Sequence, residues 1–177
     1  MRIAISGSHR VGKTSLAEAL ASILPGYELI PEPYHALEEE GHEFSDMPSL
    51  DDFLLQLERS IQSFEQSGPD TIFDRCPLDI VAYLQTHEER GAFDLAEWAG
   101  RIRDAMSRLS LLVFVPVEEP DRISVPREDR RLRAEVDEKL EELVMDSSYA
   151  GDVEVLHAGG TLEKRVASVR AQLRLLA

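Results

Sequence analysis

One stretch near the start of the chain combines glycines, a lysine and a threonine in a spacing suited to binding phosphate groups. It matches the pattern G-x-x-x-x-G-K-[ST]. Its residues are Gly7, Ser8, His9, Arg10, Val11, Gly12, Lys13 and Thr14. The glycines permit backbone angles and a close approach that a Cβ would prevent, so the amides of the loop, through Ser15, can converge on phosphate oxygens at a helix N-terminus. The pattern predicts ATP and Mg²⁺ as cofactors, with Lys13 neutralising the β- and γ-phosphates and the Thr14 hydroxyl binding the metal.

The stretch lies between an apolar, β-branched segment and a helical pattern, which is the setting that such a loop requires. We predict strands at residues 2–6, 27–30, 71–73, 111–117 and 153–156. Apolar residues recur between them with a helical period, which predicts helices at residues 14–24, 50–66, 77–89, 94–109, 135–146 and 161–176. The alternation predicts an α/β fold with a doubly wound parallel five-stranded sheet and helices on both faces.

Polar and proline residues set several boundaries in this pattern. Ser49 is predicted as the N-cap of the helix behind it, with Asp52 in the first turn. Pro31 and Pro33 are expected to block regular structure after the second strand. Residues 121–133 are strongly charged and are expected to be irregular.

The composition predicts one domain, residues 1–177, that binds small molecules rather than nucleic acid or membranes. Hydrophobic residues make up 43% and charged residues 30% of the sequence, as in ordinary folded domains, and no apolar run approaches the ~20 residues of a membrane span. The net charge of −15 repels a nucleic-acid backbone, although a local cradle of amides can still bind one nucleotide. The single cysteine, Cys76, allows no internal disulfide, and we expect a cytoplasmic protein. A homodimer is compatible with the sequence.

The residues after the third predicted strand separate classes of nucleotide-binding protein. The guanine-specifying motif N-K-x-D is absent, because none of Lys13, Lys139 and Lys164 has Asp two positions later. Motor-type ATPases usually end a strand in consecutive acids, the second of which activates water. Here Asp74 is followed by Arg75, and an arginine suits the orientation of phosphate or substrate better than the activation of water.

Two further motifs resemble those of known small-molecule kinases. Pro31-Glu32-Pro33 resembles the P-E-P element of deoxyribonucleoside kinases, and Asp74-Arg75-Cys76 stands where they carry an acid-Arg-Ser element. Residues 74–79 also resemble the D-R-x-P-L-D stretch of AAA-type small kinase domains, a group that includes the ribosylnicotinamide kinase domain. The resemblance follows the whole chain in order, with the phosphate loop as its specific part. It implies a P-loop NTPase fold of the nucleoside and nucleotide kinase type.

The resemblance implies roles for three charged residues. Glu32 would be the general base that takes the proton of the attacking hydroxyl, Arg75 would hold either Glu32 or the substrate, and Asp74 would support Mg²⁺. The alternative for Arg75 and Asp74 is a structural salt bridge. Asp79 could cap a helix or touch substrate, and Cys76 replaces the serine usual in the family and is interpreted as a small buried residue.

A local reversal of charge marks a second phosphate-binding candidate. Five arginines fall within twelve positions of this acidic chain: Arg122, Arg127, Arg130, Arg131 and Arg133. The resemblance implies a lid around residues 121–135 in which Arg127, Arg130 and Arg131 contact the ATP phosphates. The alternative is a solvated, charged face. The resemblance also places Gly160 beside the adenine, although residues 157–161 can equally form a simple turn with Thr161 as N-cap.

Together these features predict an ATP-dependent kinase that transfers the γ-phosphate to a hydroxyl of a nucleoside-like small molecule. The alternatives are a nucleoside-monophosphate or antibiotic-type phosphotransferase on the same scaffold, and a regulatory ATP-binding module with slow hydrolysis. In the helix after Ser49, Phe53, Gln56, Leu57 and Phe64 are interpreted mainly as core residues, some of which could line the acceptor pocket.

Overall fold

The sheet has the predicted topology. The computed structural model describes residues 1–45, 48–121, 126 and 129–176. Its five strands are β1 (Arg2–Ser6), β2 (Glu28–Ile30), β3 (Thr71–Asp74), β4 (Leu111–Phe114) and β5 (Glu154–His157). They lie in the order β2-β3-β1-β4-β5 and every neighbouring pair is parallel. The predicted doubly wound α/β fold is therefore confirmed.

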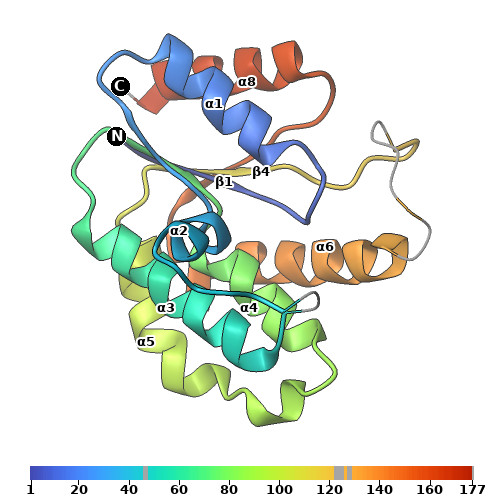
Figure 1. Ribbon diagram of the computed structural model, residues 1–177. Helices are drawn as coiled ribbons and strands as arrows, with labels where there is room; N and C mark the ends of the chain where they lie inside the picture. The colour runs from blue at the N-terminus through green and yellow to red at the C-terminus, as the bar shows by residue number, and fades with distance from the viewer. Residues whose placement is uncertain (46–47, 122–125, 127–128, 177) are drawn as a thin grey trace.

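Helices cover both faces of this sheet (Figure 1). One face is covered by α1 (Lys13–Ile23) and α8 (Leu162–Leu176), and the other by α3 (Leu50–Gln66), α4 (Pro77–Thr86), α5 (Leu95–Met106) and α6 (Asp129–Met145). Short elements complete the fold: α2 (Pro33–Glu39), η1 (Arg90–Ala92) and α7 (Ser147–Ala150). None of the helices in the described part of the chain is both long enough and apolar enough to cross a bilayer.

Alternate residues of β1 belong to the two sides of the core. Ile3 and Ile5 pack with residues of α1 and α8, whereas Ala4 packs with residues of α3, α4 and α6. A strand that is buried on both faces must be apolar at every position, since successive side chains point to opposite sides. This explains why the central strands β1 and β4 are almost continuously apolar rather than alternating.

The sheet order brings the candidate functional segments to one edge. The carboxyl ends of parallel strands meet on the same side of a sheet, which is where open α/β folds bind ligands. The strand β1 lies between β3 and β4, and the ladder continues through bonds from the Arg75 amide to Ile5 O and from the Val115 amide to Ser6 O. The loop after Ser6 is therefore flanked by Asp74 and Arg75 on one side and by Val115 on the other.

Two expectations of irregular structure were wrong in part. Pro31 and residues 121 and 126 are irregular as expected, whereas Pro33 and residues 129–133 are helical, and residues 122–125 and 127–128 lie outside the described part of the chain. The helix α2 begins at Pro33, because proline is tolerated in a first helical turn, where its missing N–H would have no partner. The helix α6 begins at Asp129, inside the segment 121–133. The buried residues Arg133, Val136 and Leu140 share one helical face. The apolar period was hidden because a buried arginine occupies its first position.

Other boundaries shifted by a few residues. The strand β4 ends at Phe114 rather than at residue 117, since Pro116 has no N–H for a ladder bond. The helix α4 ends at Thr86 rather than near residue 89, and the short helix α7 was not predicted.

The predicted N-cap of α3 is confirmed and supports a stability prediction. The Ser49 hydroxyl accepts from the Asp52 amide at 3.2 Å, and the Asp52 carboxylate accepts from the Ser49 amide at 2.9 Å. We expect Ser49→Ala to lower the free energy of unfolding by about 1 kcal/mol, measured by urea denaturation. The matched control Ser22→Ala, at an exposed position of α1, should change it by less than about 0.5 kcal/mol. Equal effects of the two substitutions would contradict the capping role.

Candidate active site

The loop between β1 and α1 holds a strained backbone that its glycines permit. A Cβ on Gly7 would lie 2.4 Å from the Val115 carbonyl oxygen, so no larger residue fits there. Gly12 has φ +89° and Arg10 has φ +55°, both left-handed. Alternation of right- and left-handed residues turns successive amides toward one point, which is the geometry of an anion-binding nest. The loop ends at the N-terminus of α1, whose first amides have no partner within the helix.

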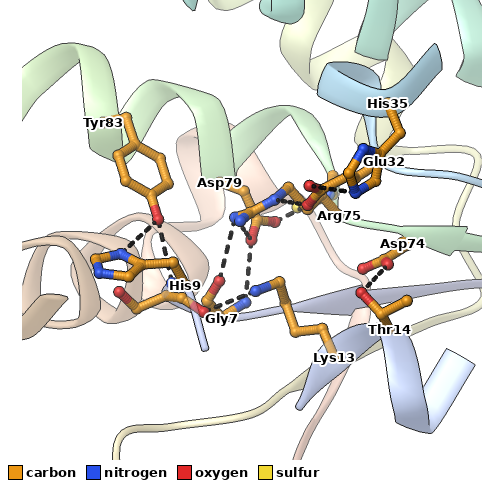
Figure 2. A network of polar contacts seen from close by, with 12 residues as sticks. Gly7, His9, Lys13, Thr14, Glu32, His35, Asp74, Arg75, Asp79 and Tyr83 are labelled. Carbon is orange, nitrogen blue, oxygen red and sulfur yellow. Dashed lines mark hydrogen bonds and ion pairs between the residues drawn. The ribbon is translucent and has the colours of Figure 1, made fainter. Parts of the chain in front are cut away.

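Two amides of the predicted phosphate-binding set are used by the protein itself. The Gly7 amide donates to Asp79 Oδ1 at 3.0 Å, and the His9 amide donates to the Tyr83 hydroxyl at 3.1 Å (Figure 2). The His9 ring contacts the same hydroxyl through Nδ1 at 3.0 Å. The main-chain amides that we expect to bind a phosphate are therefore the later ones, from Arg10 onward.

Lys13 is buried inside the loop. Its ammonium donates to the Ser8 carbonyl at 2.7 Å. The pKa of Lys13 is lowered from 10.5 to about 7, chiefly by burial and next by the nearby charge of Arg75, while the carboxylates of Asp79, Asp74 and Glu32 act in the opposite direction. A polyphosphate placed beside Lys13 would favour its charged form and raise this pKa again.

Thr14 and Asp74 form an oxygen-rich pair beside Lys13. The Thr14 hydroxyl donates to Asp74 Oδ2 at 2.6 Å (Figure 2). Asp74 Oδ1 is buried and has no hydrogen-bond partner among the described residues. Burial raises the pKa of Asp74, although the Thr14 hydroxyl and the Lys13 charge oppose this. Mg²⁺ prefers hard oxygen ligands, so a hydroxyl next to a buried carboxylate with an orphaned oxygen fits this ion.

Glu32 and Arg75 form an ion pair at the edge of the sheet. Arg75 Nε donates to Glu32 Oε2 at 2.7 Å, and both side chains are largely buried. Burial alone would raise the pKa of Glu32, but the charge and hydrogen bond of Arg75, with Lys13 and His35, leave it below its ordinary value. Arg75 has φ +82°, a conformation that costs a non-glycine residue about 1–3 kcal/mol. Of the two partners expected for Arg75, the structure brings it to Glu32.

Both carboxylate oxygens of Asp79 accept hydrogen bonds from main-chain amides. Oδ2 accepts from the Cys76 amide at 2.9 Å at the start of α4, while Oδ1 accepts from the Gly7 amide. Its side chain is fully buried, so Asp79 is a helix cap that also anchors the phosphate loop. Cys76 is buried too, and burial raises the pKa of its thiol, which agrees with its interpretation as a small packing residue.

A cavity of about 270 Å³ opens directly beside the Glu32–Arg75 pair. Its lining is largely aromatic and apolar with a few polar groups: His9, Glu32, Tyr34, Pro48, Phe53, Gln56, Arg75, Ile80, Tyr83 and Leu132. The rings of Phe53 and Tyr83 stack at 5.4 Å, and the Arg75 guanidinium lies 5.5 Å from the Tyr83 ring centre. Of the α3 residues considered from the sequence, Phe53 and Gln56 line this cavity, whereas Leu57 and Phe64 lie in the core.

In the arginine-rich segment, the residue that contacts the phosphate loop is Arg133, which was not among the arginines predicted to bind phosphate. Arg127 lies outside the described residues, and Arg130 is exposed in the first turn of α6. Arg131 pairs with Glu135 at 2.7 Å, on a different cavity lined by Gln85 and Arg90. Instead, buried Arg133 donates to the carbonyl of His9 at 3.0 Å. The structure therefore does not bring Arg131 to the loop.

Two side chains, Glu118 and Arg165, connect the Gly160 turn to the phosphate loop. The Gly160 amide donates to Glu118 Oε1 at 2.7 Å, and Glu118 Oε2 accepts from Arg165 at 3.2 Å. Arg165 in turn donates to the Val11 carbonyl at 2.6 Å. The Lys164 amide donates to the Thr161 hydroxyl at 3.4 Å, as expected if Thr161 is the N-cap.

Sequence reasoning missed Tyr83, Arg133 and Arg165 as residues of the site. Arg133 could have been found from its position on the apolar face of a helix, since a buried charge requires partners. Tyr83 and Arg165 lie in ordinary helical patterns, and only the tertiary structure brings them to the loop.

Comparison with solved structures finds the same fold in several kinases. Deoxyadenosine kinase from M. mycoides, solved with the products dCMP and a flexible dCDP, is 16% identical over 100% of both chains, with a TM-score of 0.69. Thymidylate kinase from Candida albicans is 18% identical over 98% of this chain and 91% of that chain, with a TM-score of 0.64. The NadR protein in complex with NR is 19% identical over 96% of this chain and 50% of that chain, with a TM-score of 0.67. No curated protein sequence matches the chain.

The sheet order, the loop after β1 and these structures define a P-loop domain with the fold of nucleoside and nucleotide kinases, which confirms the resemblance seen in the sequence. The model of the AAA domain family matches residues 2–165. The chain belongs to that family. At 16–19% identity the solved structures establish the fold alone, so the chemistry must be argued from the site.

The lowered pKa of Lys13 predicts how nucleotide binding depends on pH. The pKa is about 7 in the free protein and rises when a triphosphate binds, so the complex holds more protons than the free protein above pH 7. We expect the Kd of Mg·AMP-PNP to rise by up to about tenfold per pH unit between pH 7.5 and 9. Calorimetry in buffers of different ionisation enthalpy should show uptake of close to one proton.

Two variants make this test specific. Lys13→Met should bind the nucleotide weakly and without proton uptake, whereas Lys139→Met on α6 should keep the wild-type pH dependence. A pH-independent Kd in the wild-type protein would show that Lys13 does not change its charge on binding.

Proposed function

We propose that the protein is an ATP-dependent kinase that transfers the γ-phosphate of ATP to a hydroxyl group of a nucleoside-like small molecule. One observation carries this proposal. The ionised carboxylate of Glu32, held by Arg75 at 2.7 Å, lines the same cavity as His9 of the phosphate loop. An acceptor in that cavity would have its hydroxyl between a proton acceptor and the end of a bound triphosphate.

The residues around the cavity support an in-line transfer. Glu32 accepts the proton of the attacking hydroxyl as the new O–P bond forms, and Arg75 keeps the carboxylate ionised and oriented. Phosphoryl transfer has a loose transition state, so positioning matters more than the strength of the base. A carboxylate with a lowered pKa is adequate for this role. Lys13 supplies positive charge at the oxygens that become more negative.

Mg²⁺ is proposed as the metal, held by the Thr14 hydroxyl and supported by Asp74. When bound, this ion neutralises charge on the β- and γ-phosphate oxygens. The buried Asp74 oxygen without a partner among the described residues supports this assignment.

The lining of the cavity favours a nucleoside over a nucleoside monophosphate. Ligand pockets of this kind have volumes of about 300–1,000 Å³, and the cavity of about 270 Å³ lies near the lower limit. Aromatic walls suit a flat base, and Gln56 offers an amide for hydrogen bonding. A monophosphate acceptor would need cations of its own, whereas Arg75, the guanidinium among the described lining residues, is already paired with Glu32.

We further propose that residues 1–177 act as one kinase domain and that the segment around residues 121–135 closes as a lid. Closure would bring Arg130 or Arg131 toward the phosphates and exclude water, so that phosphate is transferred to the acceptor rather than hydrolysed. Arg127 is part of the same proposal. The segment follows β4 in the chain, and Arg133 near its end stays bound to the loop while the residues before it would move.

A screen of acceptors tests the activity. The purified protein with Mg·ATP is offered nucleosides, nucleoside monophosphates, aminoglycoside-type antibiotics and vitamins, and ADP release is followed. We expect steady ADP release only with a nucleoside-like acceptor. Release with a monophosphate would support the phosphotransferase alternative. Binding of ATP without turnover on any acceptor would support a regulatory module and overturn the kinase.

Substitution of the proposed base separates chemistry from nucleotide binding. Glu32→Gln should reduce kcat by about 10²-fold or more, which is the usual contribution of a general base, while the Kd of Mg·AMP-PNP stays within about twofold. The control Glu39→Gln, at an exposed position of α2, the helix that follows Glu32, should leave kcat unchanged. Undiminished turnover in Glu32→Gln would remove Glu32 from the reaction.

A further inference from the structure

Four consecutive carbonyl groups of the phosphate loop each accept a hydrogen bond from a cationic side chain. Lys13 donates to Ser8 O at 2.7 Å. Arg133 donates through Nε to His9 O at 3.0 Å and through a terminal nitrogen to Arg10 O at 3.3 Å. Arg165 donates to Val11 O at 2.6 Å. A loop carbonyl needs only water as a partner, so this run of cations requires another explanation.

The two arginines come from distant parts of the chain and are buried. Arg133 lies on α6, 124 positions from His9, and Arg165 lies on α8, 154 positions from Val11. Their side chains are 4% and 9% exposed, and each has a carboxylate partner after β4: Asp121 for Arg133 and Glu118 for Arg165. A buried guanidinium is tolerated when its donors find partners. Here the loop carbonyls complete the partners of Arg133. They also occupy one terminal nitrogen of Arg165, whose Nε has no partner among the described residues.

The geometry of the peptide bond converts these contacts into an orientation of the amides. In a trans peptide the C=O of one residue and the N–H of the next point in opposite directions. Holding the carbonyls of residues 9–11 toward the arginines therefore directs the amides of residues 10–12 to the opposite side. The left-handed conformations of Arg10 and Gly12 let those amides converge on one point.

Two neighbouring contacts fit the same arrangement. The Ser8 hydroxyl donates to the main-chain carbonyl of Arg133 at 2.9 Å. The loop and the helix α6 are therefore joined by hydrogen bonds in both directions. A Cβ on Gly12 would lie 3.3 Å from the Arg165 guanidinium. Glycine at this position therefore leaves room for the arginine as well as permitting a positive φ.

We propose that Arg133 and Arg165 act as a carbonyl clamp, which presets the amides of residues 10–12 for the triphosphate and so determines its affinity. Both are positioning residues, since they act on the nucleotide through the loop. The inference rests on the proposed function, because it takes the ligand of the loop to be a triphosphate. Lysine cannot replace arginine here, because its single ammonium cannot reproduce the planar fork that joins Arg133 to two carbonyls and a carboxylate.

The test measures binding by calorimetry with two probes, Mg·AMP-PNP and inorganic tripolyphosphate with Mg²⁺. Loss of a hydrogen bond to a charged donor is expected to weaken binding about tenfold. We therefore expect Arg133→Lys and Arg165→Lys to raise the Kd of both probes about tenfold, with a ligand-free melting temperature close to that of the wild type. The controls Lys139→Arg on α6 and Arg170→Lys on α8 should keep wild-type affinity.

Three outcomes of these measurements would contradict the clamp. Kd values within twofold of wild type in both clamp variants, or an equal loss in the controls, would overturn the proposal. Loss of AMP-PNP binding with intact tripolyphosphate binding would also overturn it, because the clamp acts on phosphates. If a clamp variant does not fold, Ser8→Ala removes only the hydroxyl that holds Arg133, and unchanged affinity in that variant would reject the role of Arg133. Neither probe requires an acceptor, so the clamp can fail while acceptor-dependent turnover stands, and the reverse.

Discussion

The direction in which the peptide groups of residues 8–11 point is the constraint on which the rest of the site depends. A phosphate ion can be bound by main-chain amides only if several of them face one point, and an isolated chain gains nothing from that arrangement. In this protein the opposite ends of those peptides are held by Lys13, Arg133 and Arg165. The fold supplies these partners from α1, α6 and α8, so the loop conformation is a property of the whole domain.

The same arrangement reconciles an acidic protein with an anionic ligand. The chain has a net charge of −15, and its long-range field opposes a triphosphate. Positive charge is concentrated instead at one edge of the sheet, on Lys13, Arg75, Arg133 and Arg165, and three of these four are paired with carboxylates at 3.2 Å or less. Lys13 has no such carboxylate partner among the described residues, and its pKa is lowered to about 7, chiefly by burial. A polyphosphate bound beside Lys13 would raise this pKa again.

Residues that contact the phosphate loop, or that neighbour such a residue, also line the adjacent cavity. The His9 amide donates to the hydroxyl of Tyr83, whose ring lines the cavity, and the His9 carbonyl accepts from Arg133, whose neighbour Leu132 lines it too. A change in the loop must therefore move groups that bound the cavity. This is a physical route for coupling two binding sites, and it is specific to these side chains. The fold itself is shared by proteins with different acceptors and does not define the chemistry.

Local patterns were sufficient for the elements whose determining residues are adjacent in sequence. The apolar run of β1, the helix α1 behind the loop and the Ser49 cap each depend on neighbours within a few positions, and all three were predicted from the sequence. Phosphate binding by the loop glycines and Lys13 stays a prediction. Pro33 was misread, because a proline stops a helix or starts one according to the turn in which it falls. Glu32 and Arg75 could be named from short motifs, but their contact required the pairing of β2 with β3. The helical pattern could mark Arg133 as buried, but none of Tyr83, Arg133 and Arg165 carries a local signal for its partner, since each meets the loop from a helix that is distant in sequence. Only the packing of those helices against the sheet decides which side chains reach it.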